Sequence, residues 1–156
     1  MARVTVDVNY KEYLKRLKLY ETETTKAVKS VLRSTAIAVE SGAKSRAPVN
    51  FGQLRSQIRP TYSSSGLKVD VGTHCNYGSF VEYGTGPRAG HDSYRYPPPI
   101  SALYLWAKRK NVNLFAVRWS IYKHGTWPHP FLFPAYEAEL PRFHNRMQVA
   151  VKAQKP

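Results

Sequence analysis

Histidine and cysteine are the residues of this chain that most readily bind metals or act as nucleophiles. The single cysteine, Cys75, has no cysteine partner at metal-ligand spacing, and no two histidines lie four residues apart on one predicted helix. The tetrahedral ligand pattern of zinc sites is therefore missing, and we predict no metal site. The nearest arrangements are His74 beside Cys75, and His124 and His129 on either side of a turn. The histidines are His74, His91, His124, His129 and His144.

Nucleophilic catalysis has equally little support in the sequence. Cys75 and His144 can be drawn as a dyad, but any chain with one cysteine and five histidines permits that drawing. The chain has no Gly-x-Ser-x-Gly motif, and "GTGPRAG" lacks the lysine and following helix of a phosphate-binding loop. We predict that the protein is not an enzyme and uses no cofactor. The rival hypothesis of a small hydrolase would require an activity that is lost on changing Cys75 or one histidine.

The strong positive charge is the most informative bulk property. The chain of 156 residues has 24 basic and 10 acidic side chains, a formal net charge of +14, which favours an acidic partner: a nucleic acid, a membrane surface or an acidic protein face. Two stretches, "YRYPPPISALYLWAKRK" and "FAVRWSIYK", interleave aromatic rings with Lys and Arg, as single-strand binders do. The rings also fall on helical stripes, which favours a packed helical hairpin with its charges in water. A sequence-nonspecific nucleic-acid-binding module therefore stays as the alternative function.

Composition also bears on where the protein is found. One cysteine excludes an internal disulfide and fits a reducing compartment. The first ten residues, "MARVTVDVNY", alternate instead of forming the apolar core of a signal peptide. The apolar runs are too short to span a bilayer, so we expect no membrane partner and a protein that is cytosolic or assembled from the cytosol.

Hydrophobic periodicity, together with residues that cap or end helices and strands, predicts the elements of the first half. Residues 2–8 alternate as a half-buried strand, and Asn9 is placed to cap a long helix from Tyr10 to about Arg46, in which a break near "ETETT" stays open. Asn50 is placed to cap a second, short helix. Two strands in "QIRPTY" and "LKVDVGT" follow, joined by a turn at "SSSG", and then a short helix that ends at Gly84.

The second half is predicted to be mainly helical. After a proline-rich extended loop, Pro99 stands in the first turn of the helix "ISALYLWAKRKN", and Asn113 caps the helix "LFAVRWSIYKHG". Pro134 starts a last helix that Pro141 should kink or restart. We expect one domain over residues 1–156, with residues 87–127 as a helical insertion within it.

Several short motifs occur in a characteristic order. A helix rich in small residues ends in "AKSRAPV", followed by "G-x-LR-x-x-I" at residues 52–58, two strands ending in "VGT", "Y-x-x-FVEYGTG", and "P-FLFPA" before a terminal helix. In this order and spacing, about residues 24–150 resemble the head–tail joining or tail-completion proteins (neck, minor tail components) of long-tailed bacteriophages. The resemblance implies an α+β fold with a long N-terminal helix packed on a small antiparallel sheet. The sequence pattern of the second half additionally predicts an inserted helical hairpin and a C-terminal helix.

The resemblance also implies a role and a set of partners. Members are non-enzymatic virion proteins whose copies form a ring, commonly a hexamer, between the head connector and the tail tube. The implied partners are other copies of the chain, the head-completion or connector protein, the tail tube or tail terminator protein, and the DNA that passes through the neck. By the motif, Arg55 should lie at the start of the sheet and Tyr83 in the element that stops the short helix, while the segment around Phe131 and Pro134 closes the core.

The candidate interaction residues are aromatic and basic, because buried aromatic side chains and arginine dominate protein interfaces and loosely placed cations suffice for phosphate contact. The sequence does not separate passing DNA from an acidic protein ring as the partner of the basic residues. The interface candidates are Arg55, Tyr83, Trp106, Trp119 and Trp127, and the DNA or acidic-partner candidates are Arg88, Arg95, Lys108, Arg109 and Lys110.

Two Gly-Thr pairs bracket the expected insertion. "SFVEYGTG" and "SIYKHGT" each end an apolar segment with a ring and then Gly-Thr. We interpret the first pair as the exit into residues 87–127 and the second as the return. Gly84 and Gly125 are then expected to adopt the left-handed conformation that ends a helix.

Overall fold

A long helix organises the molecule. The computed structural model describes residues 10–50, 52–90 and 97–153. Helix α1 (Tyr10–Arg46) has 37 residues and is unbroken at "ETETT", so it extends over roughly 55 Å at 1.5 Å per residue. Its continuity follows from the sequence, which has no proline between Tyr10 and Arg46 and its first glycine at Gly42. The predicted strand at residues 2–8 and the predicted cap at Asn9 lie outside the described residues.

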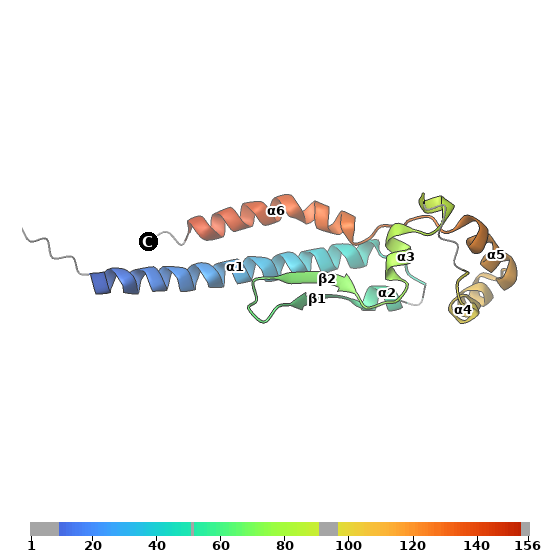
Figure 1. Cartoon of the computed structure of the whole chain (residues 1–156), viewed down its shortest axis with the longest axis horizontal. Helices are drawn as coiled ribbons and strands as arrows, with labels where there is room; N and C mark the ends of the chain where they lie inside the picture. Colours follow the sequence, from blue (N-terminus) through green and yellow to red (C-terminus); the bar gives the residue numbers. More distant parts are fainter. Residues whose placement is uncertain (1–9, 51, 91–96, 154–156) are drawn as a thin grey trace, which may run out of the picture.

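Two layers pack on opposite sides of the second half of α1 (Figure 1). On one side is an antiparallel sheet of two strands, β1 (Ile58–Tyr62) and β2 (Val69–Thr73), preceded by the short helix α2 (Gln53–Ser56). On the other side the C-terminal helix α6 (Phe133–Lys152) runs back along α1. This is the α+β architecture that the resemblance implies.

The core is built largely from small residues, which lets the layers approach closely. An ideal Cβ atom on Gly42 of α1 would lie 3.3 Å from the Cβ atom of Ala135 on α6. Phe131 and Ile58 are the largest side chains that are almost completely buried. The core cluster consists of Val39, Ala43, Ala47, Leu54, Ile58, Cys75, Phe131 and Ala135.

A helical hairpin stands at one end of the elongated molecule (Figure 1). Beyond helix α3 (Gly78–Tyr83) and the short turn η1 (Pro87–Ala89), helices α4 (Ile100–Lys110) and α5 (Leu114–His124) pack against each other. As predicted, Asn113 caps α5, its Oδ1 accepting hydrogen bonds from the backbone N–H groups of Phe115 (2.9 Å) and Ala116 (3.1 Å).

Three local predictions were wrong. Gly52, not Asn50, is the N-cap of α2; the Asn50 carbonyl instead accepts a hydrogen bond from Arg109 Nη1 (2.5 Å). Arg55 lies in α2 and not at the start of the sheet. Pro99 stands one residue before α4 because its extended ψ of 140° makes it the N-cap. Helix α6 continues through Pro141 as one helix, so it does not restart there, and a kink at Pro141 stays a prediction.

Candidate interaction surfaces and the root of the hairpin

The two Gly-Thr pairs meet at the root of the hairpin. Thr85 and Thr126 form an isolated antiparallel bridge, in which each backbone N–H donates to the other carbonyl oxygen at 3.1 and 3.0 Å. The two threonine Oγ1 atoms lie 3.0 Å apart, and Thr126 N also donates to Thr85 Oγ1. The chain therefore leaves the body of the molecule, formed by α1, the sheet and α6, and returns to it through one pair of adjacent residues, as the two motifs suggested.

Glycine is required at this root, but not for the reason expected. Gly84 and Gly125 have φ values of 71° and 74°, with ψ values of −171° and −165°. These are not left-handed helical angles; they belong to an extended region that is accessible to glycine almost alone. A Cβ atom on Gly125 would lie within 1.7 Å of the Thr85 carbonyl oxygen, and one on Gly84 within 2.6 Å of the Thr126 oxygen. Close strand pairing, rather than helix termination, determines both positions.

A buried carboxylate joins this root to the C-terminal helix. Glu82 of α3 is 6% exposed, and its Oε2 atom accepts hydrogen bonds from the backbone N–H groups of Phe131 (2.8 Å) and Leu132 (2.9 Å). Its Oε1 atom accepts one from Phe133 N at 2.8 Å. Because Phe133 is the first residue of α6, Glu82 caps that helix with a negative charge where the helix dipole favours it. Sequence reasoning missed this role.

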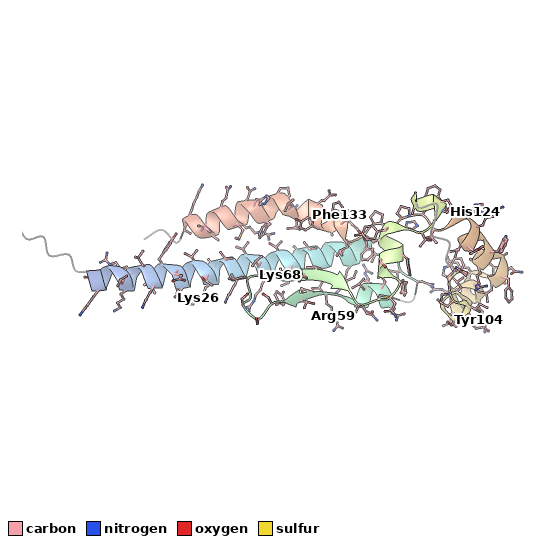
Figure 2. The ribbon with its side chains drawn as sticks, in the orientation of Figure 1. Lys26, Arg59, Lys68, Tyr104, His124 and Phe133 are labelled. Carbon is pink, nitrogen blue, oxygen red and sulfur yellow. The ribbon has the colours of Figure 1, made fainter. Side chains whose placement is uncertain are left out.

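The aromatic candidates lie mainly on the surface of the hairpin and its root. Trp119 on α5 is 65% exposed and Trp127 after α5 is 61% exposed, whereas Trp106 on α4 is half-buried. Tyr83, at the end of α3, is 66% exposed. Figure 2 shows Tyr104 and His124 at this end of the molecule, far from Lys26 on α1. Exposed apolar side chains in this number indicate a surface that other proteins cover.

An apolar depression lies on α5 beside Pro97. Its volume is about 540 Å³, and the side chains of Phe115, Trp119 and Tyr122 form much of its wall together with Pro97 and Arg118. The Trp119 and Tyr122 rings lie 5.6 Å apart between centroids. Arg118 is held in place because its Nε–H donates to the Pro98 carbonyl oxygen at 3.1 Å. The depression can accept an apolar side chain, with a guanidinium at its edge.

The basic candidates are divided between two places. Lys108, Arg109 and Lys110 form the exposed last turn of α4, where positive charge is favourable to the helix dipole. Arg88 lies apart from them at the root: its guanidinium is 5.8 Å from the centre of the Trp127 ring, and its Nη1 is 3.4 Å from the Gly125 carbonyl oxygen. Arg88 therefore supports the root as well as carrying charge. Arg95 lies outside the described residues.

The described residues contain no group of histidine, cysteine, aspartate and glutamate side chains that could hold a metal ion. No helix within residues 10–50, 52–90 and 97–153 is both long and apolar enough to cross a membrane. Burial, together with a hydrogen bond to the Cys75 thiol, raises the pKa of Tyr77 to about 12.

Comparison with known proteins identifies part of the chain. Residues 11–84 match the family described as "Bacteriophage HK97-gp10, putative tail-component". The match includes nearly all of α1, the sheet and α3, and it ends at Gly84, where the chain enters the root of the hairpin. The motif "P-FLFPA" and the C-terminal helix lie beyond it. No curated protein and no solved structure gave a significant match.

Proposed function

Residues 11–84 belong to the HK97-gp10-like family of bacteriophage tail components, and on that premise we propose that this structural, non-enzymatic tail protein is a tail-completion or head–tail joining subunit. Its copies form a ring, hexameric in our proposal, between the head connector and the tail tube. Its partners are neighbouring copies, the connector or head-completion protein, and the tail tube or tail terminator protein.

The observation that supports a ring is the presence of two unlike apolar surfaces at opposite ends of an elongated molecule (Figure 1). At one end, Phe115 and Trp119 of the hairpin are each about two-thirds exposed. At the other, Leu14 and Leu17, three residues apart on one face of α1, are each 49% exposed. A closed ring needs two different faces on each subunit, because its interfaces are heterologous.

An amber mutation in the gene of the infecting phage tests the position in the virion. We expect DNA-filled heads and complete tails that fail to join, as seen by electron microscopy of lysates. Normal virions would contradict the proposal, and so would a complete absence of tails. Complementation with Phe115→Ser/Trp119→Ser should fail to restore joining, whereas Asn145→Ser, an exposed polar change on α6, should restore it.

The basic end of α4 meets either the passing DNA or an acidic protein ring, and binding of a DNA duplex by the purified protein separates the two. For DNA, the purified protein should bind a short duplex with an affinity that falls steeply with salt. The double variant Lys108→Gln/Lys110→Gln should weaken that binding, whereas Lys152→Gln should have little effect. A tight, salt-sensitive DNA complex without self-association would instead favour the alternative, a nucleic-acid-binding module.

A further inference from the structure

The two-stranded sheet has one edge that can still accept a strand. Ser63 N donates to Lys68 O at 3.0 Å, and Lys68 N donates to Ser63 Oγ at 3.1 Å, so the backbone groups of this pair face each other across the hairpin. Hydrogen-bonded and non-hydrogen-bonded pairs alternate along an antiparallel ladder. In the register of β1 with β2, the residues of the non-hydrogen-bonded pairs therefore direct their backbone N–H and C=O groups away from the partner strand. On β1 these residues are Ile58, Pro60 and Tyr62, and on β2 they are Val69, Val71 and Thr73.

The two outer edges differ in what they offer. Pro60 has no backbone N–H, so the middle of the β1 edge cannot donate a hydrogen bond, which is a common way of blocking strand addition. The β2 edge keeps all three outward N–H and C=O groups. Among the described elements, β1 and α1 are the ones that pack extensively on β2. The β2 edge is thus the accepting edge.

The chain itself contains a segment with the matching pattern. Residues 2–8 place Ala2, Val4, Val6 and Val8 on one side and Arg3, Thr5 and Asp7 on the other. On β2, Val69 and Val71 are half-buried and Asp70 is exposed, and Val71 packs against the core. A strand of this pattern beside β2 would extend the apolar layer over α1 and keep its polar side in water.

This segment cannot reach the β2 edge of its own molecule. Aliphatic atoms of Lys29 pass about 3.4 Å from where a Cβ atom on Gly66 would stand, so the β-turn lies beside Lys29 on α1. Tyr10 is then roughly 28 Å from the turn along the helix. The stretch from Ala2 to Tyr10 spans at most about 29 Å when fully extended. Even directed straight back, Ala2 would arrive at the turn, while β2 runs about 17 Å further towards α3 (Figure 1).

We infer that residues 2–8 of one copy add as a third strand to the β2 edge of a neighbouring copy. Each copy donates a strand at one place and accepts one at another, which is the head-to-tail relation that closes a ring. The inference rests on the proposed function in needing copies of this chain to associate. It adds the segment and the edge through which they do so.

Paramagnetic broadening between two differently labelled copies tests the inference directly. Full-length protein carrying a spin label at Thr5→Cys is mixed with unsubstituted ¹⁵N-labelled protein; buried Cys75 is a poor labelling site, and the unsubstituted chain controls for it. We expect the NMR signals of Val69, Val71 and Thr73 to lose intensity, and those of β1 to be less affected. The inference is overturned if β2 signals broaden only when both labels are on one chain, or do not broaden at about 1 mM protein.

A matched pair of substitutions provides the second test. Val6→Lys, on the apolar side of the segment, should weaken self-association by about tenfold or more in analytical ultracentrifugation. Thr5→Lys, on the polar side, should change it by less than about threefold. Equal effects of the two variants would contradict the inference. If deletion of residues 2–8 leaves rings intact in virions, strand exchange is wrong but the neck function stands; if strand exchange occurs while the amber mutant makes normal virions, the neck function is wrong.

Discussion

Replacing Glu82 with alanine should destabilise the protein far more than its single position on a six-residue helix suggests. The carboxylate accepts hydrogen bonds from three consecutive backbone N–H groups at 2.8 to 2.9 Å, and these groups form the entry to α6. Alanine at this position leaves all three without that acceptor. The change therefore affects the helix that completes the core against α1, far away in the sequence.

The size of the effect follows from the burial of these groups. Leaving the buried Phe131 N–H unpaired costs about 1–3 kcal/mol, losing a helix cap costs about 1 kcal/mol, and losing the charge at the helix N-terminus costs about 0.3–1 kcal/mol. The variant also no longer buries a charged group, which offsets part of this. We expect a net loss of about 2–4 kcal/mol. A loss of 3 kcal/mol lowers Tm by roughly 6–12 °C for a domain of this size.

Urea unfolding followed by circular dichroism measures this loss, provided that the m-value is unchanged. The matched control is Glu137→Ala, an exposed glutamate on α6, which should change the free energy of unfolding by less than about 0.5 kcal/mol. Hydrogen exchange should show reduced protection at Phe131–Phe133 in the Glu82 variant. Equal stability of the two variants would refute the assignment of Glu82 as the cap of α6.

Three further predictions concern the root, the hairpin and the start of α3. Gly125→Ala should lower the free energy of unfolding by more than about 2 kcal/mol in thermal unfolding, because the added Cβ atom meets the Thr85 carbonyl. The control Gly90→Ala, also at positive φ but with open space around it, should lower it by about 1 kcal/mol. A similar loss for both variants would argue against close pairing at the root. Asn113→Ala should cost about 1 kcal/mol and raise hydrogen exchange in the first turn of α5, and unchanged exchange there would count against the cap. The folded-state pKa of Tyr77 is raised from 10.0 to about 12, so Tyr77 contributes to the free energy of unfolding below pH 10, and this contribution is lost as the pH rises towards 12. Tyr77→Phe should therefore make the fall in stability at alkaline pH less steep, as measured by urea unfolding at several pH values. An unchanged fall would show that another group causes it.

The sequence predicts the elements of this fold well because their signals are local. The long helix was predicted from Tyr10 to about Arg46, which is where α1 begins and ends, because the first proline after Tyr10 is Pro48. The strands, the turn between them and the cap at Asn113 also depend on neighbouring residues alone. Short-range periodicity and turn chemistry are sufficient at such positions.

The sequence predicts poorly where a distant segment decides the outcome. Asn50 has the chemistry of a helix cap, but the Arg109 guanidinium, 59 residues later, hydrogen-bonds its backbone and side-chain oxygens. Glu82 reads as one polar residue in an apolar segment, and its role depends on backbone groups about 50 residues away. Its position among apolar neighbours, in a motif that ends in Gly-Thr, is the signal that could have marked it as a buried carboxylate.

The bridge between Thr85 and Thr126 makes the segment between them a replaceable cassette. Because the chain leaves and returns through adjacent residues, the entropic cost of closing this segment changes only with the logarithm of its length. The hydrogen bond from Arg109 to the Asn50 carbonyl is a second link between the segment and the rest of the molecule. A change in the length of this part can therefore leave the packing of α1, the sheet and α6 in place. Such an arrangement lets the exposed aromatic surface of the hairpin change in sequence at little cost to the framework that carries it.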